Sequence, residues 1–314
     1  MRILFAGHKE RGAACLAALL SEGYEVVGVL AHHGQAATPN NVVALARQHG
    51  LPLFQPTNVN DDRLLLAIAE LRPSVTALAG YAQIANKRFI ELAPVGCVNL
   101  HAGKLPQYRG SSPLNWVLIR GEVDFTLSII QVDTGVDTGD VLAERTFPIG
   151  PNDTIADLHG IANSVFPRML VELLPALHAG TAPRRPQQAA EAAYYPIRFP
   201  DDGLIVWELM SAQEVHNRIR ALTDPYPGAF TFLNGQRIKL LASRLAKGTY
   251  RGESGRVYRK TDRGLLVCAS DRCLWIERAT VAETGVDAWP LVSRYSMFAT
   301  LRGMLLPNAS ETPA

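Results

Sequence analysis

The chain has 314 residues, of which 47% are hydrophobic and 19% are charged, an ordinary composition for a globular protein long enough to form two domains. The formal net charge of +2 is too small to indicate a polyanionic partner by itself. Residues 1–7 read as a short strand rather than a signal peptide, and no apolar run approaches the roughly 18 residues that a bilayer-spanning helix needs, so we expect a cytoplasmic protein with no membrane partner.

The first part of the chain alternates short apolar runs with helical patterns. The apolar runs are rich in β-branched residues and too short for independent helices. They cover residues 2–6, 25–30, 75–79 and 97–100. The helical patterns lie between them, over residues 13–22, 41–49 and 61–72. This alternation predicts an α/β fold with a Rossmann-like, mostly parallel sheet that has helices on both faces.

The loop after the first strand does not match a dinucleotide-binding fingerprint. A Rossmann enzyme would carry Gly-x-Gly-x-x-Gly there, whereas this chain reads Gly7-His-Lys-Glu-Arg-Gly12. A charged loop with only two glycines does not let a pyrophosphate approach the backbone closely. We therefore do not expect NAD as a cofactor.

Two strand-like segments, residues 125–132 and 140–147, flank a loop rich in Asp and Gly, which is the expected tip of a hairpin. A helix should follow over residues 153–177, with Pro167 as a kink. Residues 181–193 are rich in Pro, Gln, Arg and Ala, a composition typical of a linker.

The pattern changes after this linker. Ser211-Ala-Gln-Glu214 is a capping box that begins a short helix. Strand-like runs separated by turn residues follow, and they cover residues 229–233, 237–245, 255–259, 264–269 and 273–279. Short strands of this kind indicate a small β-barrel. The expected organisation is therefore an α/β domain over residues 1–180, a linker over 181–203 and a C-terminal β domain over 204–305.

The four cysteines do not form a Cys-x-x-Cys pair. Cys15, Cys97, Cys268 and Cys273 lie in apolar or strand-like contexts, so the sequence indicates neither a zinc site nor a disulfide framework. We expect four free thiols in a reducing cytoplasm.

Three polar residues are the candidates for catalysis. Asn99 and His101 leave the carboxyl end of a buried strand, and Asp137 lies in the Asp-rich loop of residues 133–140. Open α/β sheets place their chemistry at such strand ends. An amide, an imidazole and a carboxylate supply an oxyanion donor, a proton acceptor and a group that orients the acceptor. His101 and the Asp137 loop also have structural explanations. The histidine could simply hydrogen-bond to nearby backbone, and the loop could simply be two successive turns.

The residues between these candidates resemble the signature of the 10-formyltetrahydrofolate-dependent formyltransferases. The matching segments are His101-Ala-Gly-Lys104-Leu-Pro106-Gln-Tyr108-Arg109-Gly110, Pro113-Leu-Asn115-Trp116 and the loop around Asp137. The family includes glycinamide ribonucleotide and methionyl-tRNA formyltransferases, the hydrolase domain of formyltetrahydrofolate dehydrogenase, and enzymes that formylate amino sugars on nucleotide carriers. The resemblance covers nearly the whole chain, and it implies that residues 1–180 are the catalytic domain and that 204–305 are OB-like.

The resemblance implies that N10-formyltetrahydrofolate is the co-substrate and that Asn99, His101 and Asp137 are catalytic. Asn99 would stabilise the oxyanion that forms when an amine attacks the formyl carbon, His101 would move the proton, and Asp137 would hold the other imidazole nitrogen and fix its tautomer. Direct attack needs no metal. The folate should lie beside small residues that follow a strand and against the Asp137 loop. The expected cofactor-binding residues are Gly80, Tyr81, Ala82, Gln83, Ile84, Thr134, Gly135 and Val136.

The acceptor is harder to predict. Many family members have Ser-Leu-Leu-Pro where this chain has Gly103-Lys-Leu-Pro106, and a lysine near the histidine suits a phosphate-bearing acceptor. Residues 194–207 and 220–230 look like the branch that formylates UDP-4-amino-4-deoxy-L-arabinose. The tRNA-specific branch carries a basic insertion where residues 31–40 of this chain contain no Lys or Arg.

We therefore predict a nucleotide-linked amino sugar as the acceptor, with Lys104, Tyr108 and Arg109 as its contacts. Methionyl-tRNA is the alternative, because residues 237–263 hold nine basic and two acidic residues, although such a run is usually a solvated face. A formyltetrahydrofolate hydrolase and a non-catalytic binding protein are further alternatives. The joint presence of the three catalytic candidates argues against a silent protein. The sequence indicates neither the particular amino sugar nor the oligomeric state.

Overall fold

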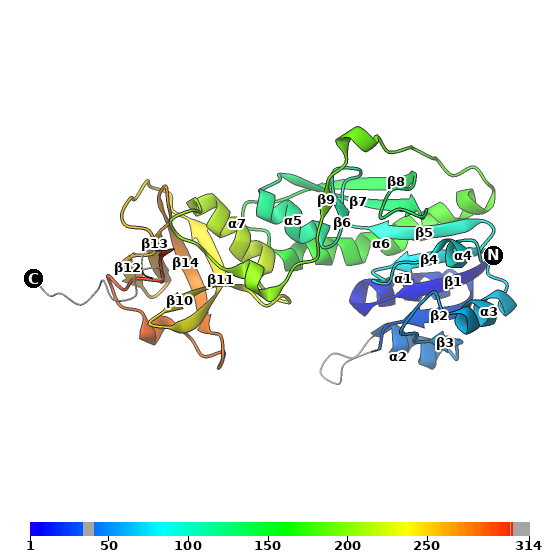
Figure 1. The fold of residues 1–314 in the computed structure, drawn as a ribbon, viewed down its shortest axis with the longest axis horizontal. Coiled ribbons are helices and arrows are strands. Elements are labelled where there is room, and N and C mark those ends of the chain that lie inside the picture. The colour runs from blue at the N-terminus through cyan, green and yellow to red at the C-terminus, as the bar shows by residue number, and fades with distance from the viewer. Residues whose placement is uncertain (34–40, 302, 304–314) are drawn as a thin grey trace, which may run out of the picture. The chain divides into compact units, whose positions relative to one another are not determined.

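The computed structural model describes residues 1–33, 41–301 and 303 (Figure 1). The chain divides into two compact units, each built from several segments. Unit 1 comprises residues 1–113, 124–148 and 159–196. Unit 2 comprises residues 114–123, 149–158 and the described residues from 197 onward. None of the described helices combines the length and the hydropathy needed to cross a bilayer.

Within its described residues, unit 1 is built on one seven-stranded sheet in the order β3-β2-β1-β4-β5-β7-β8. The strands are β1 (Arg2–Gly7), β2 (Glu25–Ala31), β3 (Leu53–Phe54), β4 (Val75–Ala79), β5 (Gly96–His101), β7 (Asp124–Gln131) and β8 (Val141–Pro148). The strands from β3 to β5 pair in parallel, and β7 and β8 are antiparallel. All residues of β4 are buried, as expected for a parallel strand covered on both faces. The predicted mostly parallel α/β sheet is confirmed.

Helices form over each of the segments that the sequence predicts. The helices of this part of the chain are α1 (Lys9–Ser21), α2 (Asn41–Gln48), α3 (Asp62–Glu70), α4 (Lys87–Ile90), α5 (Pro113–Arg120) and α6 (Ile155–His178). The carboxylate of Asp61 begins α3, because it accepts hydrogen bonds from the backbone N–H groups of Arg63 and Leu64. Helix α6 includes both Pro167 and Pro175.

In the part of unit 2 that the structure describes, five antiparallel strands form a second sheet in the order β10-β11-β14-β13-β12. These are β10 (Ala229–Leu233), β11 (Gln236–Leu245), β12 (Val257–Thr261), β13 (Gly264–Cys268) and β14 (Cys273–Val281). Helix α7 (Ala212–Leu222) begins at the predicted capping box, in which Ser211 and Glu214 each accept from the other's backbone N–H. The predicted five-stranded C-terminal domain is confirmed.

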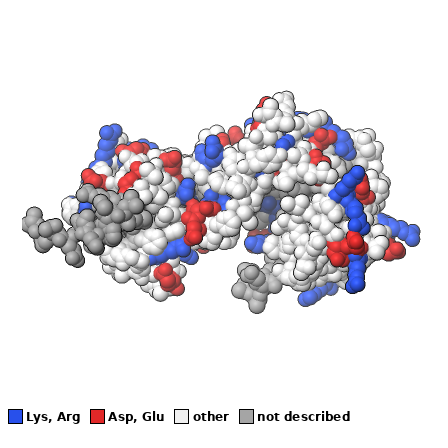
Figure 2. All heavy atoms as spheres, viewed as in Figure 1, with Lys and Arg blue, Asp and Glu red and all other residues white. Residues whose placement is uncertain are grey.

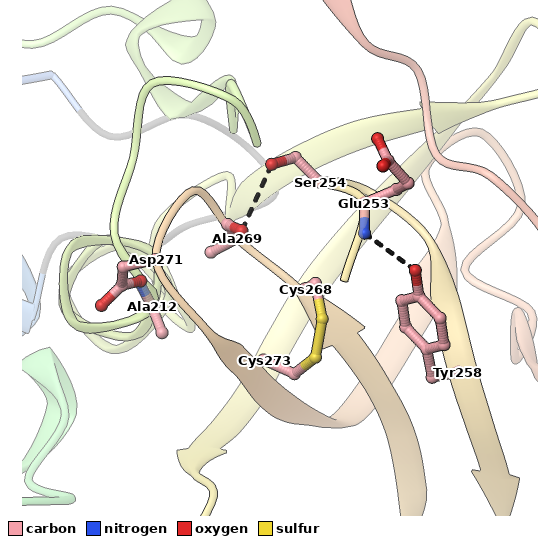
Figure 3. Close-up of a disulfide and its surroundings, with 8 residues drawn as sticks. All are labelled: Ala212, Glu253, Ser254, Tyr258, Cys268, Ala269, Asp271 and Cys273. Carbon is pink, nitrogen blue, oxygen red and sulfur yellow. Dashed lines mark hydrogen bonds between the residues drawn. A yellow bond between two sulfur atoms is a disulfide. The ribbon is translucent and has the colours of Figure 1, made fainter. Parts of the chain in front are cut away.

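Cys268 and Cys273 correct one prediction. The register of β13 and β14 pairs these two residues, and their sulfur atoms form a disulfide across the hairpin (Figure 3). The expectation of four free thiols was wrong for this pair, because cross-strand register is not visible in the cysteine spacing. Cys15 and Cys97 are buried free cysteines among the described residues, and burial raises the pKa of each thiol to about 12.

His159 should make the stability of the protein depend on pH. Its Nδ1 lies 3.2 Å from Nη2 of Arg11, so this nitrogen accepts while the ring is neutral. Burial, aided by the charges of Arg11 and Lys9, lowers the pKa of His159 from 6.5 to about 4. Between those values the unfolded chain binds a proton that the folded chain does not. This contribution to stability is therefore complete above pH 6.5 and is lost as the pH falls.

We expect the free energy of unfolding to fall by about 3 kcal/mol from this residue as the pH drops from neutral to below the folded-state pKa. Urea titrations across that range, on the wild type and on His159→Gln, measure the effect. The free energy of unfolding of the variant should fall less steeply with decreasing pH than that of the wild type. An equally steep loss in the variant would assign the pH dependence to other groups.

Candidate active site

Asn99, His101 and Asp137 lie together in unit 1. Strand β5 carries Asn99 and His101 two residues apart, so both side chains leave the same face of the strand. The hairpin loop between β7 and β8 brings Asp137 to them. Nδ2 of Asn99 lies 3.4 Å from Oδ1 of Asp137, and Nδ1 of His101 lies 3.5 Å from Oδ2 of Asp137. The structure thus brings together the three residues named from the sequence, whose catalytic roles stay predictions.

A backbone carbonyl sets the tautomer of His101. The residue is only 6% exposed, and its Nε2 lies 2.6 Å from the backbone oxygen of Tyr108. Because a carbonyl oxygen only accepts hydrogen bonds, Nε2 must carry a proton. Nδ1 is the ring nitrogen that faces Asp137. The sequence suggested that Asp137 fixes the tautomer. The Tyr108 carbonyl does so instead, and a backbone group of this kind has no sequence signature.

Asp137 has a backbone conformation that most residues avoid. Its φ is +54°, in the left-handed region that costs free energy for residues other than glycine. Two contacts hold it there: the backbone N–H of Gly110 donates to Oδ2 over 2.9 Å, and the side chain of Gln187 donates to its carbonyl oxygen over 2.9 Å. Gly139 lets the loop close, because a Cβ atom at that position would collide with the backbone oxygen of Gln131. The strained residue is therefore fixed from several sides.

The loop after β4, which contains the expected folate-binding residues, is anchored by His32. The imidazole of His32 stacks on Tyr81 with ring centroids 4.5 Å apart. Its Nε2 accepts a hydrogen bond of 3.0 Å from the backbone N–H of Ala82, and burial lowers the pKa of His32, which favours this accepting neutral form. Gly80 has a φ of +71°, so the turn that leads into the loop suits a residue without a Cβ atom.

Gln83 connects the same loop to the segment between β3 and α3. Its Oε1 accepts from the backbone N–H of Val59 over 2.6 Å, and its Nε2 donates to the backbone oxygen of Pro56 over 2.9 Å. The described contacts of Gln83 are thus within the chain. Ile84, in contrast, is 73% exposed, so its apolar side chain is accessible to a ligand.

The expected folate residues of the hairpin loop are also at the surface. Thr134 and Gly135 are exposed, and Val136 is 45% exposed. Exposed apolar side chains on this loop and at Ile84 suit a flat aromatic ligand. Folate binding by these residues stays a prediction, as does the expectation that no metal takes part.

The three residues expected to contact the acceptor differ in accessibility. Lys104 is exposed. Tyr108 is buried and stacks on Tyr195 with centroids 5.0 Å apart. Arg109 is 5% exposed, and its described hydrogen bonds go to Gln187 and to Tyr194. Only Lys104 of these three therefore offers its charge to solvent, and contact of any of them with a substrate stays a prediction.

Comparison with known families matches both parts of the chain. The formyl transferase family model matches residues 1–174, and the model of the formyl transferase C-terminal domain matches residues 199–286. The methionyl-tRNA formyltransferase of Geotalea uraniireducens (strain Rf4) is 36% identical over 283 residues, which cover 88% of this chain and 89% of that enzyme. The enzyme of the same name from Geobacter sulfurreducens is 36% identical over 281 residues, 87% of each chain.

Solved structures show the same fold at much lower identity. An N-formyltransferase from Helicobacter canadensis, in complex with folinic acid and dTDP-3-aminofucose, has a TM-score of 0.70 at 17% identity and covers 88% of this chain and 98% of its own. A methionyl-tRNA formyltransferase from Clostridium thermocellum has a TM-score of 0.58 at 20% identity, over 79% of this chain and 95% of its own. With both family models and the relatives at 36% identity, the chain belongs to the formyl transferase family and is a formyltetrahydrofolate-dependent formyltransferase.

Proposed function

We propose that this enzyme moves the formyl group of N10-formyltetrahydrofolate directly onto a primary amine, with Asn99, His101 and Asp137 as its catalytic residues. The observation that carries the proposal is that the Asp137 carboxylate lies within 3.5 Å of both Asn99 Nδ2 and His101 Nδ1. These are the groups that a tetrahedral intermediate with a negative oxygen and a positive nitrogen requires.

Each side chain has a defined task in the transfer. The acceptor nitrogen forms a bond to the formyl carbon, and the bond from that carbon to N10 breaks. One N–H of the Asn99 amide faces Asp137, and the second donates to the oxyanion. Nδ1 of His101 takes the proton from the attacking nitrogen and delivers it to the departing N10. The Asp137 carboxylate stabilises the imidazolium that forms between these two steps.

We infer that the acceptor is methionyl-tRNA. The sequence alone favoured a nucleotide-linked amino sugar, but the relatives at 36% identity over most of the chain are methionyl-tRNA formyltransferases and support the alternative. The argument against tRNA rested on residues 31–40, and from residue 34 onward this loop lies outside the described residues.

Basic side chains of unit 2 support a polyanionic acceptor. Of the nine Lys and Arg residues between 237 and 263, only Arg244 has a carboxylate within 4.0 Å among the described residues, that of Glu277. Figure 2 shows Lys and Arg side chains on the surface of this unit, interspersed with Asp and Glu side chains. Arg237 and Lys239 line a surface pocket of about 300 Å³, to which Glu283 also contributes, and Nε of Arg237 is buried without a hydrogen-bond partner among the described residues. These two cations are the proposed phosphate contacts.

A nucleotide-linked amino sugar is the second candidate. Lys104 is exposed three residues after His101, where a cation suits the phosphate groups of a small acceptor. The solved N-formyltransferase with the higher TM-score of the two holds dTDP-3-aminofucose. An amino-sugar nucleotide would not need to contact the basic residues of unit 2. Substitutions of these residues can therefore distinguish the two acceptors.

The two acceptors predict opposite mutational patterns. For tRNA, Arg237→Ala with Lys239→Ala should raise KM and lower the slope of log KM against log salt by about one for each phosphate that is no longer neutralised, while Lys104→Ala has little effect. For a sugar nucleotide, Lys104→Ala should raise KM by about 10- to 100-fold, because a charge-assisted hydrogen bond to phosphate is typically of that size. Initial rates with charged initiator tRNA and with an amino-sugar nucleotide panel, each at low and physiological salt, measure both patterns.

Lys87→Ala is the matched control, because Lys87 lies on α4 and faces Glu91. It should leave KM for either acceptor unchanged. Every assay uses N10-formyltetrahydrofolate as donor, and neither a chelator nor NAD should alter the rate. Formylation of the sugar panel that is insensitive to salt, without formylation of tRNA, would reverse the choice of acceptor.

A further inference from the structure

The chain segment that leads out of unit 1 is bound to the loops of the candidate active site. Arg185 and Val141 exchange two backbone hydrogen bonds of 2.9 and 3.0 Å. Further along, β9 (Tyr194–Tyr195) pairs in parallel with β6 (Arg109–Gly110), which follows directly on the Tyr108 carbonyl that His101 contacts. The stretch with the composition of a linker therefore touches the segments that carry His101 and Asp137.

Gln187 is the inward-pointing residue of this segment. All other residues from 183 to 191 are exposed, whereas Gln187 is half-buried. Its Nε2 donates to the backbone oxygens of Asp137 and Gly139, over 2.9 and 2.7 Å. Its Oε1 accepts from Nε and Nη2 of Arg109, over 3.0 and 2.8 Å. The amide nitrogen and the amide oxygen of Gln187 thus each take part in two hydrogen bonds within the chain.

Arg109 fixes which way this amide points. Its guanidinium is buried, donates to the hydroxyl of Tyr194 over 2.9 Å and lies over the Tyr194 ring, 5.4 Å from the centroid. A guanidinium only donates hydrogen bonds, so the amide oxygen of Gln187 must face it. The amide nitrogen is then directed at the two carbonyl oxygens of the Asp137 loop. Neither a carboxylate nor an apolar side chain can serve both neighbours.

We propose that Gln187 is a positioning residue for the formyl transfer. It holds the backbone on both sides of Thr138, and it thereby keeps the left-handed Asp137 in the orientation that turns its carboxylate toward His101 and Asn99. The inference rests on the catalytic role of Asp137 proposed above. It extends the active site to a segment that lies about fifty residues further along the chain than the loop it supports.

Gln187→Glu is the most specific test, because it exchanges one atom. The carboxylate still accepts from Arg109, but it presents an oxygen to the carbonyls of Asp137 and Gly139, so the loop is released. We expect kcat to fall about tenfold, as small misplacements of catalytic groups do, with a melting temperature close to wild type. Gln188→Glu is the matched control: the same change at the exposed neighbour should leave kcat unchanged.

A double-mutant cycle separates positioning from a general structural role. In an Asp137→Asn background, adding Gln187→Glu should cost no further activity, because the group that Gln187 positions is already disabled. Multiplicative losses would show that Gln187 acts elsewhere and would overturn the inference, as would a wild-type kcat in Gln187→Glu. If Asp137→Asn alone were fully active, the proposed function itself would fail. Gln187→Met, which is neutral and of similar length, replaces Gln187→Glu if that variant does not fold, with the same expectations.

Discussion

His101→Asn and Asp137→Asn should each lower kcat by on the order of 10² or more, because they remove the proton transfer and the charge that stabilises it. Among the described residues, His101 is the one imidazole that has Nδ1 facing Asp137 and Nε2 fixed by a carbonyl, so we expect no neighbouring histidine to replace it. Single-turnover rates with formyltetrahydrofolate, together with thermal melting curves, measure the loss and show that each variant folds.

Asp137→Asn tests the charge of the carboxylate without changing the backbone conformation at this position. Asparagine tolerates positive φ better than most residues do, so the left-handed conformation at this position survives. Its Oδ1 can still accept from Gly110. Only the negative charge beside Nδ1 of His101 is lost. Asp140→Asn, in the same loop, provides the matched control and should retain wild-type rates. Wild-type rates in either catalytic variant would contradict the assignment of these roles.

Local pattern was sufficient to predict the architecture. Strands β1 and β4 are short and almost wholly buried, and such runs between amphipathic helices fit a parallel sheet. In unit 2, turn residues separate the five strands, and the capping box at Ser211 marks the start of α7. The position of Asn99 and His101 could also be predicted, because both residues lie at the end of a strand that the pattern itself defines.

The interactions that complete the site depend on pairing between distant segments. Gln187 lies in a stretch whose composition is polar and rich in proline, and composition does not show that one side chain in it turns inward. The β6–β9 pairing and the disulfide between Cys268 and Cys273 have the same origin. Both depend on the register between two segments, and the sequence of either segment alone does not show that register. The tautomer of His101 depends on a backbone carbonyl, which every residue has.

The acceptor could not be predicted for a different reason. Lys104 gives one exposed cation near the site, whereas the basic run of unit 2 gives many further along the chain. Both are compatible with phosphate, and sequence pattern does not show which of them an acceptor contacts. Identity to relatives adds the evidence that favours tRNA, and the salt dependence of formylation is the physical property that distinguishes the two.

Asn99→Ala should lower kcat by roughly 10² to 10³, the usual cost of losing an oxyanion donor, with little change in folate affinity. Register to Leu78 on one side and Ile130 on the other holds residue 99 within β5, so a shorter side chain leaves the strand in place. The hydrogen bond to the formyl oxygen strengthens only as negative charge develops, so its removal affects the transition state far more than the bound ground state.

Two measurements on the same variant decide between these roles. Binding of folinic acid, whose formyl group lies on a different nitrogen, reports the ground state, and the single-turnover rate reports the transition state. Asn99→Asp serves as the second variant, because it keeps the size of the side chain but replaces the donor with an acceptor that repels an oxyanion. It should be at least as slow as Asn99→Ala. If folate affinity fell in parallel with the rate in Asn99→Ala, Asn99 would be a ground-state ligand, and the oxyanion would need another donor.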